Sequence, residues 1–367
     1  MEHLWFNLFG LLGITTRGLL GRSITATGVA IVLIAGLTAN TILAGDRPRL
    51  AVLTDIGGDP DDQQSLIRLM IYSNEFEIEA LVASAVRANH AKDGPTTRPQ
   101  LIREIVDAYG RVLPNLQKHA SDWPTVEAMR ASIHSGNPNY GRAYIGDGHD
   151  TTTSRFLIER IDAGTADRPL NIAVWGGQTD LAQALWRVKH DRSDVGFREF
   201  AKNFRVYDID DQDGIAEWMR AEFPGMFYIL AKAATGAGNR TGVFRGMYLG
   251  GDESLTSREW VERNVCSTGP LGALYPMKTS TMPNRYGCMK EGDSPSWFFF
   301  LPIGGNDPND PTKPGWGGQF VRQPDGWYRD VLPKPGFAPI EAVNRWRTDF
   351  QKDFARRIAW CHVDSTK

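Results

Sequence analysis

The chain has 367 residues, of which 41% are hydrophobic and 23% are charged, as in an ordinary globular protein with one large domain or two smaller ones. Its formal net charge is −2. Proteins that bind nucleic acids usually carry a clear basic surplus, so we predict no nucleic-acid partner.

The first predicted element is an apolar leader. No charged residue occurs between Arg22 and Asp46, and the most apolar part is Gly28–Leu37. This pattern predicts a secretory signal over residues 1–44, cleaved after Ala44, and hence an exported protein, periplasmic or extracellular, without a stable membrane partner. The alternative is an uncleaved anchor, because the uncharged span is just long enough for a membrane helix.

Four aspartates crowd into eight residues directly after the first predicted strand of the mature chain, Leu50–Thr54. A helix with one apolar face is predicted at Gln63–Tyr72, so the acids lie in a strand-to-helix turn, where ligands of open α/β sheets bind. Clustered carboxylates repel one another unless a cation or a proton relieves them, and oxygen-rich clusters suit Ca²⁺ or Mg²⁺. Capping of the helix is the alternative for one of these acids. The four are Asp55, Asp59, Asp61 and Asp62.

Apolar strands and amphipathic helices alternate along a single predicted domain, residues 48–361. Further strands are predicted at Ile78–Ser84, Asn171–Trp175, Phe204–Ile209 and Phe227–Leu230. Further helices are predicted at Pro99–Tyr109, Thr153–Ile161, Asp180–Val188 and Ile340–Trp360. The alternation predicts an α/β fold with an open, mainly parallel sheet flanked by helices.

Three later segments carry candidate side chains. The turn after Trp175 contains Thr179, which could instead be only a helix cap. The acidic run after Ile209, residues 210–213, is either a solvated loop or a set of ligands for sugar hydroxyls. Asp293 precedes the apolar run 297–301, and an aspartate in that position is often a cap.

Between Asn264 and Phe337 the chain becomes rich in Gly, Pro, Trp and Phe, as in long loops that form or clamp a site. Its tryptophans could stack on sugar faces or pin these loops to the core. They are Trp297, Trp316 and Trp327. In an exported chain Cys266 and Cys288 could form a disulfide, or all three cysteines could be free. The cysteine and histidine spacing fits no zinc site.

Taken together, these turns resemble nucleoside hydrolases, and most closely the group labelled cellulose-binding proteins with a nucleoside-hydrolase-like domain. The resemblance covers residues 49–361. Its motifs are Thr54-Asp-Ile-Gly-Gly-Asp-Pro-Asp-Asp-Gln63, Trp175-Gly-Gly, Asp211-Gln-Asp213, Gly269-Pro-Leu-Gly-Ala-Leu-Tyr-Pro276, Glu291-Gly-Asp-Ser-Pro295 and Pro314-Gly-Trp-Gly-Gly318.

The resemblance implies one Ca²⁺ ion and a set of ligands. Asp55 would bridge the metal and an activated water and act as general base. The remaining metal ligands would be Asp61, Asp62, the backbone carbonyl of Thr179, and Asp293, with Asp59 as a possible further ligand. The residues that would bind substrate are Asp211, Gln212, Asp213, Glu291 and Trp297.

Some positions depart from the hydrolase pattern. Gly292 stands where hydrolases of purine nucleosides carry the histidine that protonates the leaving group, which leaves His90, His149 and Glu291 as candidate donors. The sequence therefore predicts an exported, calcium-dependent hydrolase that acts on a glycosidic bond of a carbohydrate or glycoconjugate. The alternatives are a carbohydrate-binding protein, for example one that binds cellulose, with a structural metal and no catalysis, and a true N-ribosyl (nucleoside) hydrolase.

Overall fold

The computed structural model describes residues 47–87, 89–278, 284 and 287–362. These residues build one eight-stranded sheet with strand order β3-β2-β1-β4-β5-β6-β8-β7. All neighbouring strands are parallel except the pair β7 and β8. The predicted fold class is confirmed. The predicted signal or anchor, residues 1–44, lies outside the described residues.

The strands agree with the predicted ones to within one or two residues, apart from three short ones that the sequence pattern did not indicate. The strands are β1 (Arg49–Thr54), β2 (Glu77–Ala83), β3 (Ile133–Ser135), β4 (Leu170–Trp175), β5 (Phe204–Ile209), β6 (Phe227–Ala231), β7 (Phe320–Arg322) and β8 (Tyr328–Asp330). The unpredicted strands β3, β7 and β8 have three residues each, too few to show a period in the sequence.

The α-helices follow the predicted alternation. They are α1 (Asp61–Met70), α2 (Pro99–Leu116), α3 (Val126–Ala131), α4 (Thr152–Asp162), α5 (Gln178–Asp191), α6 (Asp194–Ala201), α7 (Ala216–Glu222), α8 (Arg258–Asn264), α9 (Ser294–Phe298), α10 (Glu341–Asn344) and α11 (Arg347–Ile358). The prediction of one continuous helix at Ile340–Trp360 is wrong, because the structure has two separate helices there, α10 and α11. Arg347 donates to the carbonyls of Gly246 and Leu249, which ties the junction between the two helices to a neighbouring turn.

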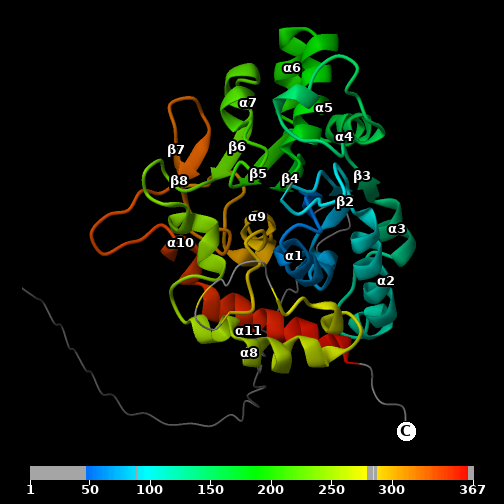
Figure 1. The fold of residues 1–367 in the computed structure, drawn as a ribbon, viewed down its shortest axis with the longest axis vertical. Helices are drawn as coiled ribbons and strands as arrows, with labels where there is room; N and C mark the ends of the chain where they lie inside the picture. The colour runs from blue at the N-terminus through cyan, green and yellow to red at the C-terminus, as the bar shows by residue number, and fades with distance from the viewer. Residues whose placement is uncertain (1–46, 88, 279–283, 285–286, 363–367) are drawn as a thin grey trace, which may run out of the picture. The chain divides into compact units, whose positions relative to one another are not determined.

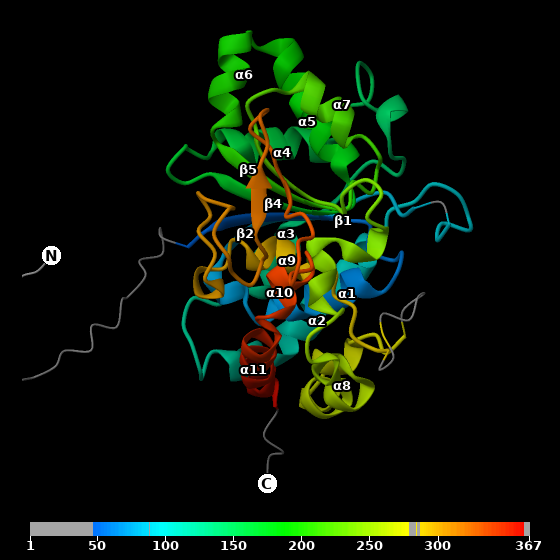
Figure 2. The ribbon, with the colours of Figure 1, turned by 90° about the vertical axis from the view of Figure 1, so that its left-hand side faces the viewer.

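Both faces of the sheet are buried. The side chains of β1 show this, since they point alternately into two hydrophobic cores. Leu50 and Val52 belong to the larger core, and Ala51 and Leu53 belong to the other. Helices α1, α2, α9 and α11 cover the first face, and α4 to α7 cover the second (Figures 1 and 2). A strand buried on both faces reads as a continuous apolar run, which is why β1 could be recognised.

The chain order reverses between β1 and β4. From β1 the chain moves to β2 on one side, and it later returns to place β4 on the other side of β1. In open α/β sheets such a switch point leaves a crevice at the carboxyl ends of the two strands. Asp55 follows β1 and Gly176 follows β4, so both lie at this crevice.

The aromatic residues and cysteines of the long loops belong mainly to the interior. Trp297, Trp316 and Trp327 are buried, and Trp327 stacks on Tyr228 with ring centroids 3.9 Å apart. The three cysteines, all within the described residues, are free thiols. Within the part of the chain that the structure describes, no helix has the length and apolar character needed to span a membrane.

Candidate functional site

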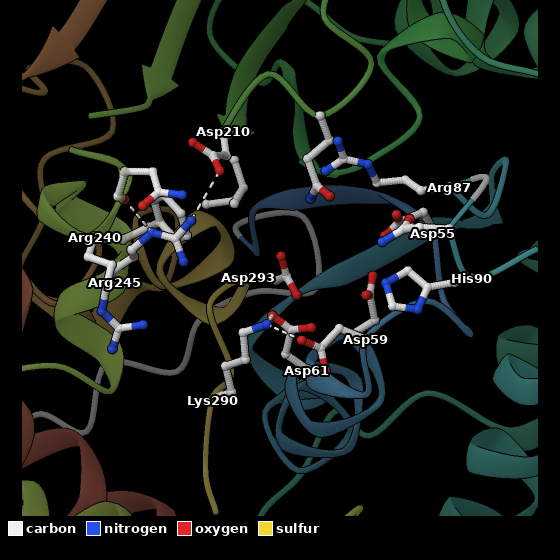
Figure 3. A pocket seen from close by; sticks show the side chains of 16 residues that line it. Asp55, Asp59, Asp61, Arg87, His90, Asp210, Arg240, Arg245, Lys290 and Asp293 are labelled. Carbon is white, nitrogen blue, oxygen red and sulfur yellow. Dashed lines mark hydrogen bonds and ion pairs between the residues drawn. The ribbon is translucent and has the colours of Figure 1, made fainter. Parts of the chain in front are cut away.

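Three predicted metal ligands converge from two distant segments. Asp61 and Asp62 form the first turn of α1, and Asp293 directly precedes α9. Each of the three offers one carboxylate oxygen, and these oxygens all lie within 4.8 Å of one another. Figure 3 shows Asp293 pointing toward Asp61. The convergence that the sequence predicted for these three acids is present.

Asp55 joins this acid cluster, which from here on means Asp55, Asp61, Asp62 and Asp293. Asp55 and Asp62 are close enough to influence each other's pKa, and Asp62 accepts a hydrogen bond from the hydroxyl of Thr54. A Cβ atom added to Gly176 would lie 2.9 Å from the Asp55 Cβ, so a side chain there would displace Asp55. The glycine turn after β4 therefore makes room for the acid after β1.

Burial and crowding make these acids hard to ionise. Burial, followed by the neighbouring carboxylates Asp61 and Asp213, raises the pKa of Asp55 to about 8. Burial raises the pKa of Asp61 to about 6, although Lys290 opposes this shift. Burial and the neighbouring acids also raise the pKa values of Asp62 and Asp293 well above the usual range. Ionisation of all four acids at neutral pH is therefore unfavourable, and a nearby cation would favour it.

One buried carboxylate oxygen of the cluster lacks a hydrogen-bond partner in the part of the chain that the structure describes. Asp293 is only 3% exposed, and its Oδ2 atom has no hydrogen-bond partner among the described residues. Burial of an unpaired carboxylate oxygen is costly. Together with the spacing of the oxygens, this fits a hard divalent cation such as Ca²⁺, for which Asp61, Asp62 and Asp293 would be the ligands.

A lysine borders the cluster. The Lys290 ammonium forms an ion pair with Asp59 and lies 3.5 Å from Asp61 Oδ2. Asp59, predicted as a possible ligand, therefore has a protein cation as its partner. Lys290 neutralises part of the negative charge on the side of the site that faces Asp59.

The segment that carries Asp293 is fastened to α1. Gln64 accepts hydrogen bonds from the backbone N–H groups of Lys290 and Glu291 through its Oε1 atom. One helical turn further, Arg68 Nε lies 2.5 Å from Glu291 Oε2, and neither side chain is exposed. We call these contacts the α1 clasp, because they hold Asp293 beside the acids of α1.

The acid cluster forms the floor of a pocket of about 530 Å³. Six carboxyl groups and four cationic side chains line this acid pocket. The cations are Arg87, Arg240, Arg245 and Lys290. Gln212 also lines the pocket, and its amide donates to the carbonyl of Trp175 at 2.8 Å.

Another aspartate of the wall is Asp210, which belongs to the acidic run predicted after Ile209. Its carboxylate lies 3.2 Å from Arg245, and the two side chains approach each other across the pocket in Figure 3. Arg87 extends from the loop after β2 and lies near Asp55 in the same view. The arginines follow no helical or strand period in the sequence, so only the tertiary structure could identify them.

Several predicted residues lie outside the acid pocket. Among the described residues that line it, Thr179 is absent; its N–H and hydroxyl both donate to Asp213, at 2.7 and 2.6 Å. The carboxylate of Asp213 therefore binds the first turn of α5. Asp211 pairs with Lys232 at 2.9 Å and lines a neighbouring cavity. Because neither Thr179 nor Asp213 lines the acid pocket, we leave the Thr179 carbonyl out of the proposed cation site and Asp213 out of the residues proposed to touch substrate.

Glu291 and Trp297 are interior residues. Glu291 is fully buried, binds Arg68 and accepts a hydrogen bond from Tyr275 at 2.5 Å. Trp297 is also fully buried and packs against Tyr72, with ring centroids 5.3 Å apart. Because protein atoms cover both side chains, neither can contact a sugar, and Glu291 cannot donate a proton to one.

Of the two histidines considered as proton donors, one lies at the acid pocket and the other does not. His90 lines the acid pocket and lies beside Asp59 in Figure 3. His149 packs against Tyr144, away from the pocket lining. Among the three proton donors considered from the sequence, His90 alone lies at the acid pocket.

Comparisons with known proteins agree with this architecture. The family model of the cellulose-binding Sde182, nucleoside hydrolase-like domain matches residues 49–320. A solved nucleoside hydrolase-related hypothetical protein from Saccharophagus degradans, described as associated with carbohydrate metabolism, is 29% identical, with a TM-score of 0.69. That match covers 87% of this chain and 73% of the other. No curated protein matches the chain. The chain belongs to the family of cellulose-binding Sde182, nucleoside hydrolase-like domains.

Proposed function

We propose that this protein is an exported, calcium-dependent hydrolase that acts on a glycosidic bond of a carbohydrate or glycoconjugate. The observation that carries the proposal is the acid cluster, in which aspartates from the turn after β1, from α1 and from the segment before α9 meet on the floor of a pocket. The family description supports a carbohydrate ligand. The uncharged run between Arg22 and Asp46 supports export.

The proposed division of labour follows from the position of each side chain. Asp61, Asp62 and Asp293 would hold Ca²⁺, which supplies Lewis acidity that lowers the pKa of water. Asp55 would accept a proton from the water whose oxygen attacks the anomeric carbon. As the glycosidic C–O bond breaks, His90 would protonate the departing oxygen.

The second candidate function is carbohydrate binding without catalysis. The observation that favours it is the Lys290 ammonium, which already pairs with Asp59 and approaches Asp61. A protein cation in that position can stabilise acids that no longer take part in a reaction. Nucleoside hydrolysis is less well supported, because Gly292 occupies the position of the leaving-group histidine.

The test compares the full chain with two variants on nitrophenyl glycosides, nucleosides and polysaccharides, each with Ca²⁺ or EDTA. We expect glycoside turnover that needs Ca²⁺ and falls by about 10² to 10⁴ in Asp55→Asn, because this change removes the general base. The matched control is Asp167→Asn, which alters an exposed aspartate elsewhere and leaves turnover unchanged. Retention on polysaccharide without turnover, insensitive to EDTA and to Asp55→Asn, would favour the binding protein instead.

A further inference from the structure

We propose that the ligand is a chain of several sugar units, which occupies a groove running from the acid pocket along the carboxyl edge of the sheet to β8. The inference rests on the proposed function, because it concerns the substrate of the same site. Two cavities beyond the acid pocket would also bind the ligand. A nucleoside or a monosaccharide would be too short to reach them.

Three cavities adjoin one another because they share wall residues. The acid pocket and a bridging cavity of about 360 Å³ are both lined by Asp210 and Asn239. The bridging cavity and an edge cavity of about 570 Å³ are both lined by Lys232, Ala233 and Ala234. The three cavities are therefore adjacent, and we take them as successive parts of the proposed groove.

The direction of the groove follows from the sheet. Asp210 and Asp211 follow β5, Lys232 follows β6, and Leu332 lies just after β8. Strands β5, β6 and β8 are parallel neighbours, so these residues lie at the same edge of the sheet. The groove thus crosses three strand ends, starting from the acid cluster.

The backbone at the start of the groove directs consecutive side chains into two cavities. Asp210 and Asp211 both have left-handed backbone conformations, with φ of 70° and 52°. Asp210 pairs with Arg245 in the acid pocket, whereas Asp211 pairs with Lys232 in the edge cavity. Left-handed backbone is costly for a residue other than glycine, and such strain is concentrated at functional sites.

The edge cavity has the mixed chemistry that a pyranose ring needs. Val321 is 45% exposed and Leu332 is 65% exposed, so both offer aliphatic surface to the C–H face of a sugar. The ion pair between Asp211 and Lys232 and the amide of Gln323 offer hydrogen bonds to hydroxyl groups. The acid pocket alone is already large enough for a small molecule, so the additional cavities are suited to a longer ligand.

The experiment measures how affinity depends on chain length, by calorimetry on the full chain carrying Asp55→Asn, so that binding is recorded without turnover. The probes are cellobiose and cellohexaose, with digalacturonate and hexagalacturonate as acidic chains of the same lengths. Leu332→Ser removes aliphatic surface from the edge cavity. The matched control is Val195→Ser in α6, where an aliphatic side chain of similar exposure, 60%, is removed elsewhere.

For at least one of the two series we expect the long chain to bind at least about tenfold more tightly than the short chain. Leu332→Ser should weaken binding of the long chain about fivefold and leave the short chain unchanged, and Val195→Ser should change neither. Three results would contradict the proposed groove. They are equal affinity for long and short chains, an equal effect of Leu332→Ser on both lengths, and no binding of either long chain. Calcium-dependent turnover with length-independent binding would refute the groove alone. Length-dependent binding without turnover would refute only the hydrolase.

Discussion

Individual residues at this site have backbone conformations and pKa values that are unfavourable in a free chain. Four described non-glycine residues have positive φ, and three of them lie at the functional region. Asp210 lines the acid pocket, Asp211 lines the edge cavity, and Glu291 belongs to the α1 clasp. The acid cluster adds electrostatic strain, because burial and crowding raise the pKa values of its members. Packing elsewhere in the domain has to stabilise both kinds of strain, and functional sites are where proteins retain them.

The raised pKa of Asp55 predicts how stability depends on pH without divalent cations. This pKa is about 8 in the folded chain, against 3.8 for a free aspartate, so between these values the folded chain binds more protons than the unfolded chain. The contribution of Asp55 to stability is therefore lost as pH rises through that range. An asparagine does not ionise and escapes this loss.

We expect Asp55→Asn to gain melting temperature relative to the wild type as the pH rises from about 4 to about 8 in EDTA. The measurement is a set of thermal melts of both proteins across this range. A difference in melting temperature that stays constant, or that shrinks as the pH rises, would show that Asp55 is not buried among acids as described.

At the level of elements, α1 serves both the site and its support. Its first turn provides Asp61 and Asp62, and its next turns provide Gln64 and Arg68, which hold the segment before α9. The site and the α1 clasp therefore depend on the same helix. Movement of this helix would separate Asp293 from its partners.

Breaking the α1 clasp on one side should destabilise the domain. Arg68→Met leaves Glu291 buried without its cation, which costs about 3–5 kcal/mol in the free energy of unfolding. The double change Arg68→Met with Glu291→Met removes both charges, so it should cost much less. Urea denaturation of the three proteins measures both effects. If the double variant loses as much stability as the single one, the ion pair is not the source of the loss.

The sequence could predict what is local or periodic. The apolar run of β1, the apolar face of α1 and the acids between them lie within about two dozen residues, so their placement follows from secondary structure alone. Asp293 could be placed beside them only through the resemblance to a known family. The roles assigned to Glu291 and Trp297 failed because sequence does not reveal burial, and Arg68, the partner of Glu291, lies 223 positions away.

For the whole molecule, the strand order explains why the site lies where it does. The reversal between β1 and β4 opens a crevice that places Asp55 beside Gly176, and the chain returns from β6 through long loops to bring Asp293 against α1. Residues separated by more than two hundred positions thus meet at one edge of the sheet. The central claim is that this meeting creates a site for a divalent cation.

The most direct test is an anomalous difference map from crystals of the full chain grown with Ca²⁺. We predict a peak bounded by carboxylate oxygens of Asp61, Asp62 and Asp293, at the distances of about 2.3–2.6 Å that Ca²⁺ prefers, with the Lys290 ammonium paired to Asp59. A map without a peak at saturating Ca²⁺, with the Lys290 ammonium lying between these carboxylates, would contradict the cation site and the hydrolase that depends on it.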